Sequence, residues 1–409
     1  VPPPPHNLPT APTSFIGRTD ELTQITTRLT TPETRLLTIT GAGGMGKSRL
    51  ALEATHQLLP AFKQGIFYVP LVGLPSADLL VSTIAQALGL TLHGRTAPQK
   101  QLINYLRHKT MLLFLDNFEH LLEGVDLLLD FLTAAPQLKL LITSREPLAI
   151  GDEWVLPLSG LSYADGQPLA AQLFAERAQR LDLSFDPTAA QAEINQICTL
   201  AEGMPLAIEL AAAWVRVIPC AAIATEIQRN LDFLATDLGL VPEHQMSIRA
   251  VFRYSWSLLS DEVQVVFSRL AVFQGSFTRD AAETVVGASL RTLSTLVDKS
   301  LLQKEARGRF RLHPLLQQFG IDLLEPAARQ TITTLYATYY ANLVQQLEPA
   351  MYEAGDLQLL ADFQADLENI RAVWKWLSQH RQNGGLIEQL LPVTAYFFHR
   401  LSLFHEGLA

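Results

Sequence analysis

Short apolar runs alternate with amphipathic stretches through the first 150 residues of the chain. Apolar residues spaced three and four apart are typical of helices that bury one face, whereas short uninterrupted apolar runs are typical of strands buried on both faces. The expected strands are residues 36–40, 65–70, 111–115 and 138–143, and the expected helices between them are residues 47–59, 76–88 and 99–107. Strands that alternate with helices predict a parallel α/β sheet.

After about residue 161 the strand pattern fades and helical spacing takes over, as in residues 168–181, 188–201 and 205–217. Residues 245–320 are helical again and end in KSLLQKEARGRFRLH, two alternating runs joined by a glycine-containing turn around residues 306–308. Helices that close on a β-hairpin predict a winged helix. Residues 330–409 have helical spacing with several aromatic pairs, and a repeat array there is a hypothesis because no clean 34-residue period can be counted.

Composition limits the class of protein. Apolar residues make up 48% and charged residues 17% of the 409 residues, which is typical of a globular protein with large cores. The apolar runs are far shorter than the roughly 20 residues of a membrane helix, so no membrane span is expected. The two cysteines, Cys198 and Cys220, cannot form a disulfide framework in a chain of this size. We therefore expect a cytoplasmic protein.

The net charge of −9 excludes a global nucleic-acid footprint. Residues 1–150 carry 12 basic and 11 acidic side chains, and the rest of the chain carries 19 and 29. A local exception is residues 243–320, with 10 basic and 7 acidic side chains. Residues 1–14 hold six of the 23 prolines and no signal-peptide pattern, so we interpret them as a linker that follows a removed N-terminal effector domain.

A phosphate-binding loop is the strongest motif. The stretch from Gly41 to Ser48 reads GAGGMGKS and fits the pattern G-x-x-x-x-G-K-[ST] between an expected strand and an expected helix. Such glycines let backbone N–H groups surround an anion, and the helix dipole adds to the attraction. Lys47 is expected on the β- and γ-phosphates, and Ser48 on Mg²⁺.

Two further strand ends supply candidate chemistry. Asp116 follows an apolar strand and is expected to hold Mg²⁺ directly or through water. Its neighbour Asn117 cannot take a proton from water, and Glu119 is acidic but lies three residues along, so hydrolysis of ATP stays an open question. Arg145 ends another strand and could contact a γ-phosphate, or it could pair with Glu119 or Glu146.

Several strings in one order resemble a known family. FIGR at Phe15–Arg18, the phosphate loop, LLFLDN, ITSR and GMPLAIELA at residues 203–211 are together similar to the nucleotide-binding module of the STAND NTPases, nearest to the NB-ARC-like and LuxR/AfsR-type bacterial ATPases. The resemblance covers residues 14–320. It departs from the family pattern at Met204, where Leu is usual, and at Pro314, where many relatives have Asp.

The resemblance implies a role for each matching residue. FIGR would lie over the adenine, Pro205 would pack on the nucleotide, and His313 would bond to the ADP phosphates; a buried structural role for His313 stays open. The nucleotide-binding residues would be Phe15, Ile16, Gly17, Arg18, Gly41, Gly43, Gly44, Met45, Gly46, Lys47, Ser48, Arg49, Pro205 and His313. The catalytic residues would be Lys47, Asp116, Glu119 and Arg145, and the metal ligands Ser48 and Asp116.

The expected fold is an α/β P-loop NTPase domain with a parallel sheet (residues 15–157), then an all-α helical subdomain (158–240), a winged-helix domain (241–325) and a C-terminal α-helical, TPR-like region (326–409). The implied function is a switch that is closed and monomeric with ADP and opens and forms homo-oligomers on exchange for ATP. An unidentified ligand or protein at the C-terminal helices would trigger the exchange. The alternatives are direct DNA binding through the winged helix, which the modest local charge does not favour, a constitutive ATPase and a nucleotide kinase.

Overall fold

The computed structural model describes residues 4–10, 13–72, 74–93, 96–163, 168–235, 247–347, 357–379 and 384–400. The chain divides into two compact units. The first consists of Val1–Val251 with Asp298–Ser300, and the second of Phe252–Val297 with Leu301–Ala409. The expected domain boundary between residues 240 and 241 lies outside the described residues.

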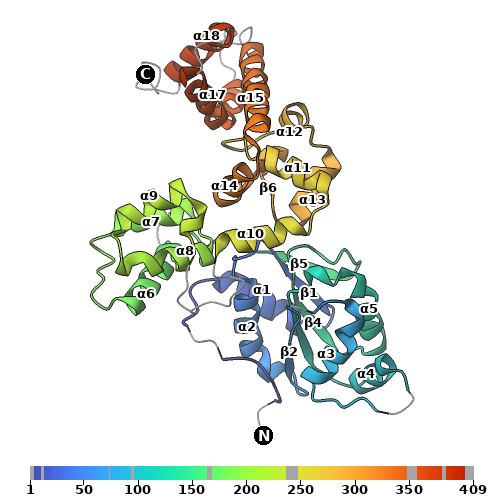
Figure 1. The fold of residues 1–409 in the computed structure, drawn as a ribbon. Coiled ribbons are helices and arrows are strands. Elements are labelled where there is room, and N and C mark those ends of the chain that lie inside the picture. The colour runs from blue at the N-terminus through green and yellow to red at the C-terminus, as the bar shows by residue number, and fades with distance from the viewer. Residues whose placement is uncertain are drawn as a thin grey trace. The chain divides into compact units, whose positions relative to one another are not determined.

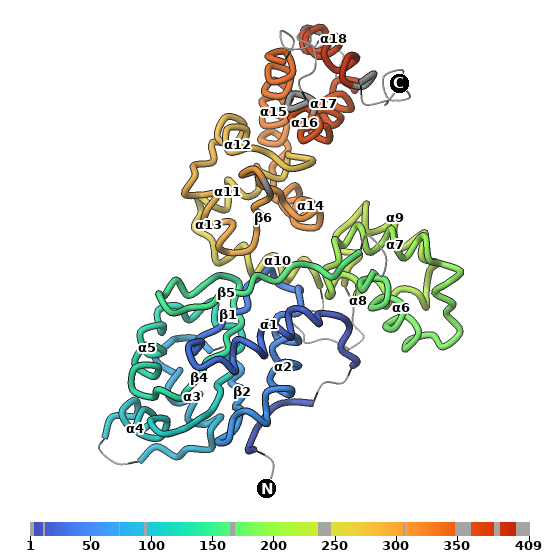
Figure 2. The backbone as a smooth tube through the Cα atoms, turned by 180° about the vertical axis from the view of Figure 1, so that it is seen from behind, coloured from blue at the N-terminus to red at the C-terminus, as the bar shows by residue number. Residues whose placement is uncertain are grey.

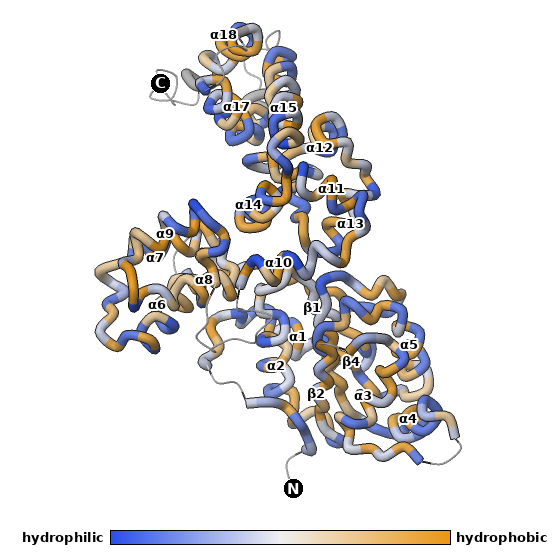
Figure 3. The backbone as a smooth tube through the Cα atoms, in the orientation of Figure 1, coloured by the Kyte–Doolittle hydropathy of each residue, from blue (hydrophilic) through white to orange (hydrophobic). Residues whose placement is uncertain are grey.

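A five-stranded parallel sheet forms the centre of the first unit (Figure 1). The strand order is β2-β3-β4-β1-β5. The strands are β1 (Leu36–Thr40), β2 (Ile66–Pro70), β3 (Leu112–Asp116), β4 (Lys139–Thr143) and β5 (Glu153–Pro157). Every residue of β1 and β3 is buried, as their apolar runs predict, and Figure 3 shows hydrophobic colour along the sheet.

The four expected strands are confirmed, but β5 was missed. β5 pairs with β1 at an edge of the sheet, and Trp154 and Val155 are 43% and 42% exposed. A partly exposed edge strand lacks the continuous apolar run that marks a buried strand. Its sequence, EWVLP, therefore carried no strand signal.

Helices cover both faces of the sheet. Alternate strand residues, among them Leu113 and Ile142, pack into one hydrophobic core with the helices of one face. The helices of that face are α3 (Leu80–Ala87), α4 (Pro98–Leu106) and α5 (Val125–Ala134), while α1 (Thr19–Thr30) and α2 (Lys47–Leu58) lie on the other face. Because β3, β4 and β1 are neighbours and parallel, the loops that follow them meet at one edge of the sheet.

A helical subdomain completes the first unit. Its helices pack together in both views of the molecule (Figures 1 and 2). They are α6 (Leu169–Leu181), α7 (Gln191–Leu200), α8 (Pro205–Ala212) and α9 (Cys220–Arg229). The expected helix over residues 205–217 is shorter, because α8 gives way to a 3₁₀ turn at Ala213–Arg216.

The proline-rich N-terminal segment is extended, as expected, but it packs on the sheet. The carbonyl of Pro5 accepts a hydrogen bond from Ile66 N at 3.2 Å. The side chain of Asn7 accepts from Tyr68 N at 2.6 Å and donates to Tyr68 O at 2.8 Å, and Leu8 is buried. Residues 4–10 thus lie along the edge strand β2 and bind some of its backbone groups, which an unattached linker would leave unpaired.

The second unit contains helices and one hairpin. Strands β6 (Gln303–Lys304) and β7 (Phe310–Arg311) pair antiparallel around a turn at Ala306–Gly308, so the expected hairpin is present. The helices are α11 (Asp261–Leu270), α12 (Arg279–Val286), α13 (Leu290–Asp298), α14 (Pro314–Asp322), α15 (Pro326–Gln346), α16 (Leu357–Ala365), α17 (Leu367–Gln379) and α18 (Gly384–Arg400), and α10 (Ile248–Ser257) crosses from the first unit to the second. The winged-helix and TPR-like descriptions remain predictions.

No helix in the described part of the chain is both long and apolar enough to span a bilayer.

Removal of a core side chain under the sheet should destabilise the first unit strongly. Phe131 on α5 is fully buried, so Phe131→Ala should lower the free energy of unfolding by about 3–5 kcal/mol. Leu129 on the same helix is 37% exposed, and Leu129→Ala should cost less than about 1 kcal/mol. Urea denaturation of the two variants checks this, and equal shifts in the midpoint would contradict the packing described.

Candidate functional site

The phosphate loop joins β1 to α2 and has the backbone that its glycines allow. Gly44 and Gly46 have φ of +83° and +86°, a left-handed conformation that other residues adopt at a cost. A Cβ at Gly44 would lie 3.1 Å from the Cβ of Leu206, so space also requires glycine there. Successive residues in such a turn form a concave array of N–H groups that suits an anion.

Lys47 begins α2 and is buried against the loop. Its Nζ donates to Gly41 O at 2.6 Å and to Ala42 O at 3.0 Å. Burial lowers the pKa of Lys47 from 10.5 to about 8, with a smaller contribution in the same direction from Arg145, while the carboxylates of Glu119 and Asp116 oppose the shift. The loop carbonyls thus hold the ammonium, and the carboxylates of Glu119 and Asp116 offset only part of the effect of burial on its pKa.

Three hydroxyl groups hold the carboxylate of Asp116 at the end of β3. Ser48 Oγ donates to Oδ1 at 2.6 Å, and Thr143 Oγ1 at the end of β4 donates to the same oxygen. Tyr68 on β2 donates to Oδ2 at 3.1 Å. Burial and the neighbouring Asp116 raise the pKa of Tyr68 far above its usual value, so the phenol stays a donor.

The sequence analysis missed Thr143 and Tyr68. Both stand near the carboxyl ends of expected strands, where a hydroxyl among apolar residues is a signal for a site. The pair that it named, Ser48 and Asp116, is brought together. A hydroxyl and a carboxylate at this spacing fit Mg²⁺, which keeps several waters and binds one or two protein groups together with phosphate oxygens.

Arg145 and Glu119 form a buried ion pair beside the loop. Arg145 Nε donates to Glu119 Oε1 at 3.1 Å, and the two side chains are 10% and 2% exposed. Burial disfavours ionisation of Glu119, but the charges of Lys47 and Arg145 outweigh it and hold the pKa of Glu119 below its usual value. Of the alternatives left open for Arg145, pairing with Glu119 is the one that the structure contains.

Arg145 also faces the phosphate loop. A Cβ placed on Gly43 would lie 3.3 Å from Nη2 of Arg145. The guanidinium therefore lies against the loop while its Nε donates to Glu119. This position is consistent with the expected contact to a γ-phosphate, which stays a prediction.

The start of α8 packs on the phosphate loop. Leu206 N donates to Gly44 O at 3.2 Å, and a Cβ at Gly46 would lie 3.8 Å from Cγ of Pro205. Met204, at the position where the family pattern has Leu, is fully buried. The GMPLA motif thus lies against the phosphate loop, and the expected contact of Pro205 with a nucleotide stays a prediction.

The FIGR segment lies between the loop and the helical subdomain. Arg18 is buried and donates to Ser159 O at 2.6 Å and to Met45 O at 3.4 Å. A Cβ at Gly17 would meet Leu169 on α6. Because protein groups occupy the guanidinium of Arg18, its described role is to fix the segment to the loop.

The two aromatic and aliphatic residues of FIGR, Phe15 and Ile16, are partly buried. The guanidinium of Arg49 lies 5.5 Å from the ring of Phe15. Contacts of the FIGR segment with adenine, chiefly through Ile16 and Arg18, stay predictions, and so does nucleotide binding by Arg49.

His313 belongs to the second unit. It is 2% exposed, and its Nδ1 accepts a hydrogen bond from Leu315 N at 3.2 Å at the start of α14. A His at this position caps the helix, which is the structural alternative named above. Its expected bond to ADP phosphates stays a prediction.

The basic side chains around the hairpin are largely engaged with acidic partners. Within the second unit, Arg309 pairs with Asp366 at 2.5 Å, and both side chains are nearly buried. The weaker pairs are Arg307 with Asp362 at 3.9 Å and Arg311 with Glu305 at 3.7 Å. Lys299, which belongs to the first unit, pairs with Glu146 at 2.8 Å. Arg309–Asp366 is the most buried of these pairs, while the exposed pairs of Arg307 and Arg311 are weak, so direct DNA binding by the hairpin stays a hypothesis.

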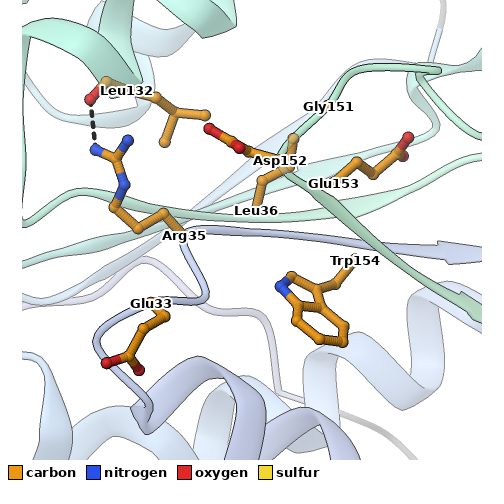
Figure 4. A pocket seen from close by; sticks show the side chains of 8 residues that line it. All are labelled: Glu33, Arg35, Leu36, Leu132, Gly151, Asp152, Glu153 and Trp154. Carbon is orange, nitrogen blue, oxygen red and sulfur yellow. Dashed lines mark hydrogen bonds between the residues drawn. The ribbon is translucent and has the colours of Figure 1, made fainter.

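A cavity of about 520 Å³ lies elsewhere in the first unit (Figure 4). It is lined at the amino ends of β1 and β5 by Leu36, Glu153 and Trp154, together with Glu33, Arg35, Leu132, Gly151 and Asp152. Arg35 donates to Leu132 O there. None of the expected site residues lines it, and ligands of α/β sheets bind at the carboxyl ends of strands, so we do not assign the nucleotide to it.

Comparison with known proteins agrees with the loop chemistry. A family described as an AAA domain matches residues 31–146. “Uncharacterized protein Mb0918” of Mycobacterium bovis is 32% identical over 326 residues, which cover 76% of this chain and 81% of that protein. “Putative HTH-type transcriptional regulator Mb0914c” of the same species is 32% identical over 395 residues, 92% of this chain and 43% of that protein. The chain thus spans less than half the length of the latter relative.

More distant similarity extends over most of the chain. “Regulatory protein AfsR” of Streptomyces griseus is 25% identical over 343 residues, 77% of this chain and 33% of that protein. A solved Signal Transduction ATPase with Numerous Domains (STAND) protein with a tetratricopeptide repeat sensor, from Pyrococcus horikoshii, is 15% identical, with a TM-score of 0.35 and coverage of 97% of this chain and 56% of that chain.

Binding of a phosphate group near Lys47 should take up a proton in mildly alkaline solution. The ligand-free pKa is about 8, and an adjacent anion raises it because it favours the ammonium form. Affinity for ADP should therefore fall as the pH rises above about 8, while below that pH Lys47 is already charged.

Calorimetric titration in two buffers of different ionisation enthalpy measures this uptake, at about pH 6.5 and about pH 8.5. The observed enthalpy should depend on the buffer more strongly at the higher pH. Lys47→Arg, whose guanidinium stays charged, should remove the excess uptake. An enthalpy that is independent of the buffer at the higher pH would count against the buried ammonium.

Proposed function

The chain belongs to the family of STAND-like P-loop NTPases, and we propose that it is a regulatory switch controlled by ATP and ADP. The supporting observation is the contact of α8 with the phosphate loop, in which Leu206 N donates to Gly44 O. A nucleotide held by this loop would touch both the sheet and the helical subdomain. Exchange of the nucleotide then changes the free energy of the arrangement of these two parts, which is the requirement for a ligand-driven switch.

Different residues around the loop would bind different parts of the nucleotide. The loop amides and Lys47 would bind the phosphates, with Ser48 and Asp116 at the metal. Mg²⁺, when bound, supplies positive charge that neutralises the phosphate oxygens. Pro205 and the FIGR segment would flank the rest of the nucleotide.

Hydrolysis is proposed to be slow. Asn117 follows Asp116 and cannot accept a proton, and Glu119 is held by Arg145 instead of facing a free space that water could fill. A switch requires only that the bound nucleotide persists long enough to set the conformation. Slow hydrolysis would then return the protein to its ADP form.

The regulatory output would come from the whole protein. The relative named as an HTH-type regulator is more than twice as long as its aligned region, and a further effector domain together with a partner at the C-terminal helices would complete the signal. We propose a monomer with ADP and a homo-oligomer with ATP. Transcription is a fitting output for this family, but the paired charges of the hairpin give no reason to assign DNA contact to it.

Loss of the Lys47 ammonium should abolish tight binding of ADP. Its charge-assisted hydrogen bonds contribute about 1.5–3 kcal/mol each, so Lys47→Ala should weaken binding about 100-fold or more. Lys63, which is exposed, provides the matched control, and Lys63→Ala should bind ADP normally. Calorimetry measures both affinities, and mass spectrometry of nucleotide released on denaturation identifies the resting ligand. Unchanged affinity in Lys47→Ala would refute the site.

Turnover should be that of a switch. We expect hydrolysis on the order of 10⁻³ to 10⁻² s⁻¹, comparable to GTPases without an activating partner. Release of inorganic phosphate from radiolabelled ATP in single-turnover experiments measures it. Many cycles per second in the absence of a partner would instead favour a constitutive ATPase.

A further inference from the structure

We propose that Glu119 is an internal counter-ion that competes with the γ-phosphate of ATP for Arg145, and thereby makes the site prefer ADP. This inference rests on the proposed function, because it assumes that the phosphate loop binds nucleotides. It adds a selection between the two nucleotides and assigns it to one ion pair.

The backbone places Glu119 for this role. Asn117 adopts a left-handed conformation with φ of 66°, and the chain then enters a 3₁₀ turn at Phe118–His120. This turn directs Glu119 into the protein, where 2% of its side chain is exposed. Among the described residues, Oε1 accepts from Arg145 while Oε2 has no hydrogen-bond partner although it is buried.

A buried carboxylate oxygen without a partner is costly, so the charge of Glu119 depends on its cations. Lys47 and Arg145 are those cations, since both hold the pKa of Glu119 low. Together with Asp116, the site contains two buried cations and two buried carboxylates. The ligand-free site is therefore close to neutral, and each added negative charge must compete for the same two cations.

The guanidinium of Arg145 already has partners within the protein, and a γ-phosphate would have to share it with Glu119. Its Nη2 lies against the loop at Gly43, and its Nε binds Glu119. The backbone carbonyl of Arg145 accepts from Ser300 Oγ at 2.6 Å, and its Nη1 donates to Val251 O at 3.4 Å. A γ-phosphate would therefore have to draw on a guanidinium that protein groups already hold. A terminal phosphate that drew the guanidinium away would leave Glu119 buried next to a second anion.

The two nucleotides should differ in what they demand of this pair. ADP ends at the β-phosphate, which Lys47 and the loop amides can bind while the ion pair stays intact. ATP adds charge on the side of Arg145, so its binding has to weaken the ion pair or bear the repulsion of Glu119. The pair thus lowers the affinity for ATP relative to ADP, and any event that releases Glu119 raises it.

Neutralisation of Glu119 tests the inference. Glu119→Gln keeps the shape and the acceptor for Arg145 but removes the charge. We expect the affinity for the slowly hydrolysed ATP analogue AMP-PNP, with Mg²⁺, to rise about tenfold or more, which is the factor that one charge-assisted hydrogen bond contributes. The affinity for ADP should change about threefold or less, because ADP leaves the ion pair intact. Calorimetric titration with each nucleotide gives the ratio of the two affinities.

Three further variants make the result specific. Glu146→Gln removes a neighbouring carboxylate that pairs with Lys299, and it should leave the ratio unchanged. Glu119→Asp keeps the charge and should retain a preference for ADP. In an Arg145→Gln background, Glu119→Gln should have a much smaller effect on the ratio of affinities. The guanidinium for which Glu119 and the γ-phosphate compete is then absent. Thermal denaturation of each variant confirms that it is folded.

The outcomes separate the inference from the proposed function. If Glu119→Gln binds ADP as the unmodified protein does and the ratio stays the same, Glu119 does not select between nucleotides and the inference is wrong. An equal effect of Glu146→Gln would also overturn it, since the cause would then be general electrostatics. If the unmodified protein bound neither nucleotide, the proposed function would fail, and the inference with it.

Discussion

The candidate site of the first unit depends on the mutual compensation of buried charges. Lys47 and Arg145 are buried at the phosphate loop, and Asp116 and Glu119 are buried beside them. An isolated ion in such a place is very costly, so each of the four is held by hydrogen bonds or by an opposite charge. The arrangement is stable without a ligand only because the two signs nearly cancel, and this near cancellation makes it responsive to an added phosphate.

The sheet topology brings the four charges together. β3, β4 and β1 are adjacent and parallel, and the chain leaves each of them at the same edge. Asp116 and Glu119 lie at and after the end of β3, and Arg145 follows β4. The glycines of the phosphate loop follow β1. α8 then lies on the loop from the side of the helical subdomain, so the loop contacts both the sheet and that subdomain. A small change in charge there reaches both the sheet and the helices.

Much of this could be predicted from the sequence, and the failures have physical reasons. The buried strands and the phosphate loop were predictable because a continuous apolar run is typical of a buried strand, and glycines in this spacing are typical of a phosphate-binding loop. β5 did not, because Trp154 and Val155 remain exposed at an edge. The partner of Arg145 stayed open between Glu119 and Glu146, because only the left-handed backbone of Asn117 decides which carboxylate turns inward. Likewise, the hydroxyls of Tyr68 and Thr143 near strand ends are a local signal for a site, but the order of the strands determines that both donate to Asp116.

Tyr68 joins the proline-rich segment to the carboxylate of Asp116. Its backbone N–H and C=O are both bound by the side chain of Asn7, and its hydroxyl is bound to Asp116. Detachment of the proline-rich segment from the edge of the sheet would therefore remove two of the hydrogen bonds that hold Tyr68, which donates to Asp116. Displacement of the polypeptide around Asn7 would therefore change the position of the Tyr68 ring and, with it, the hydrogen bond to Asp116.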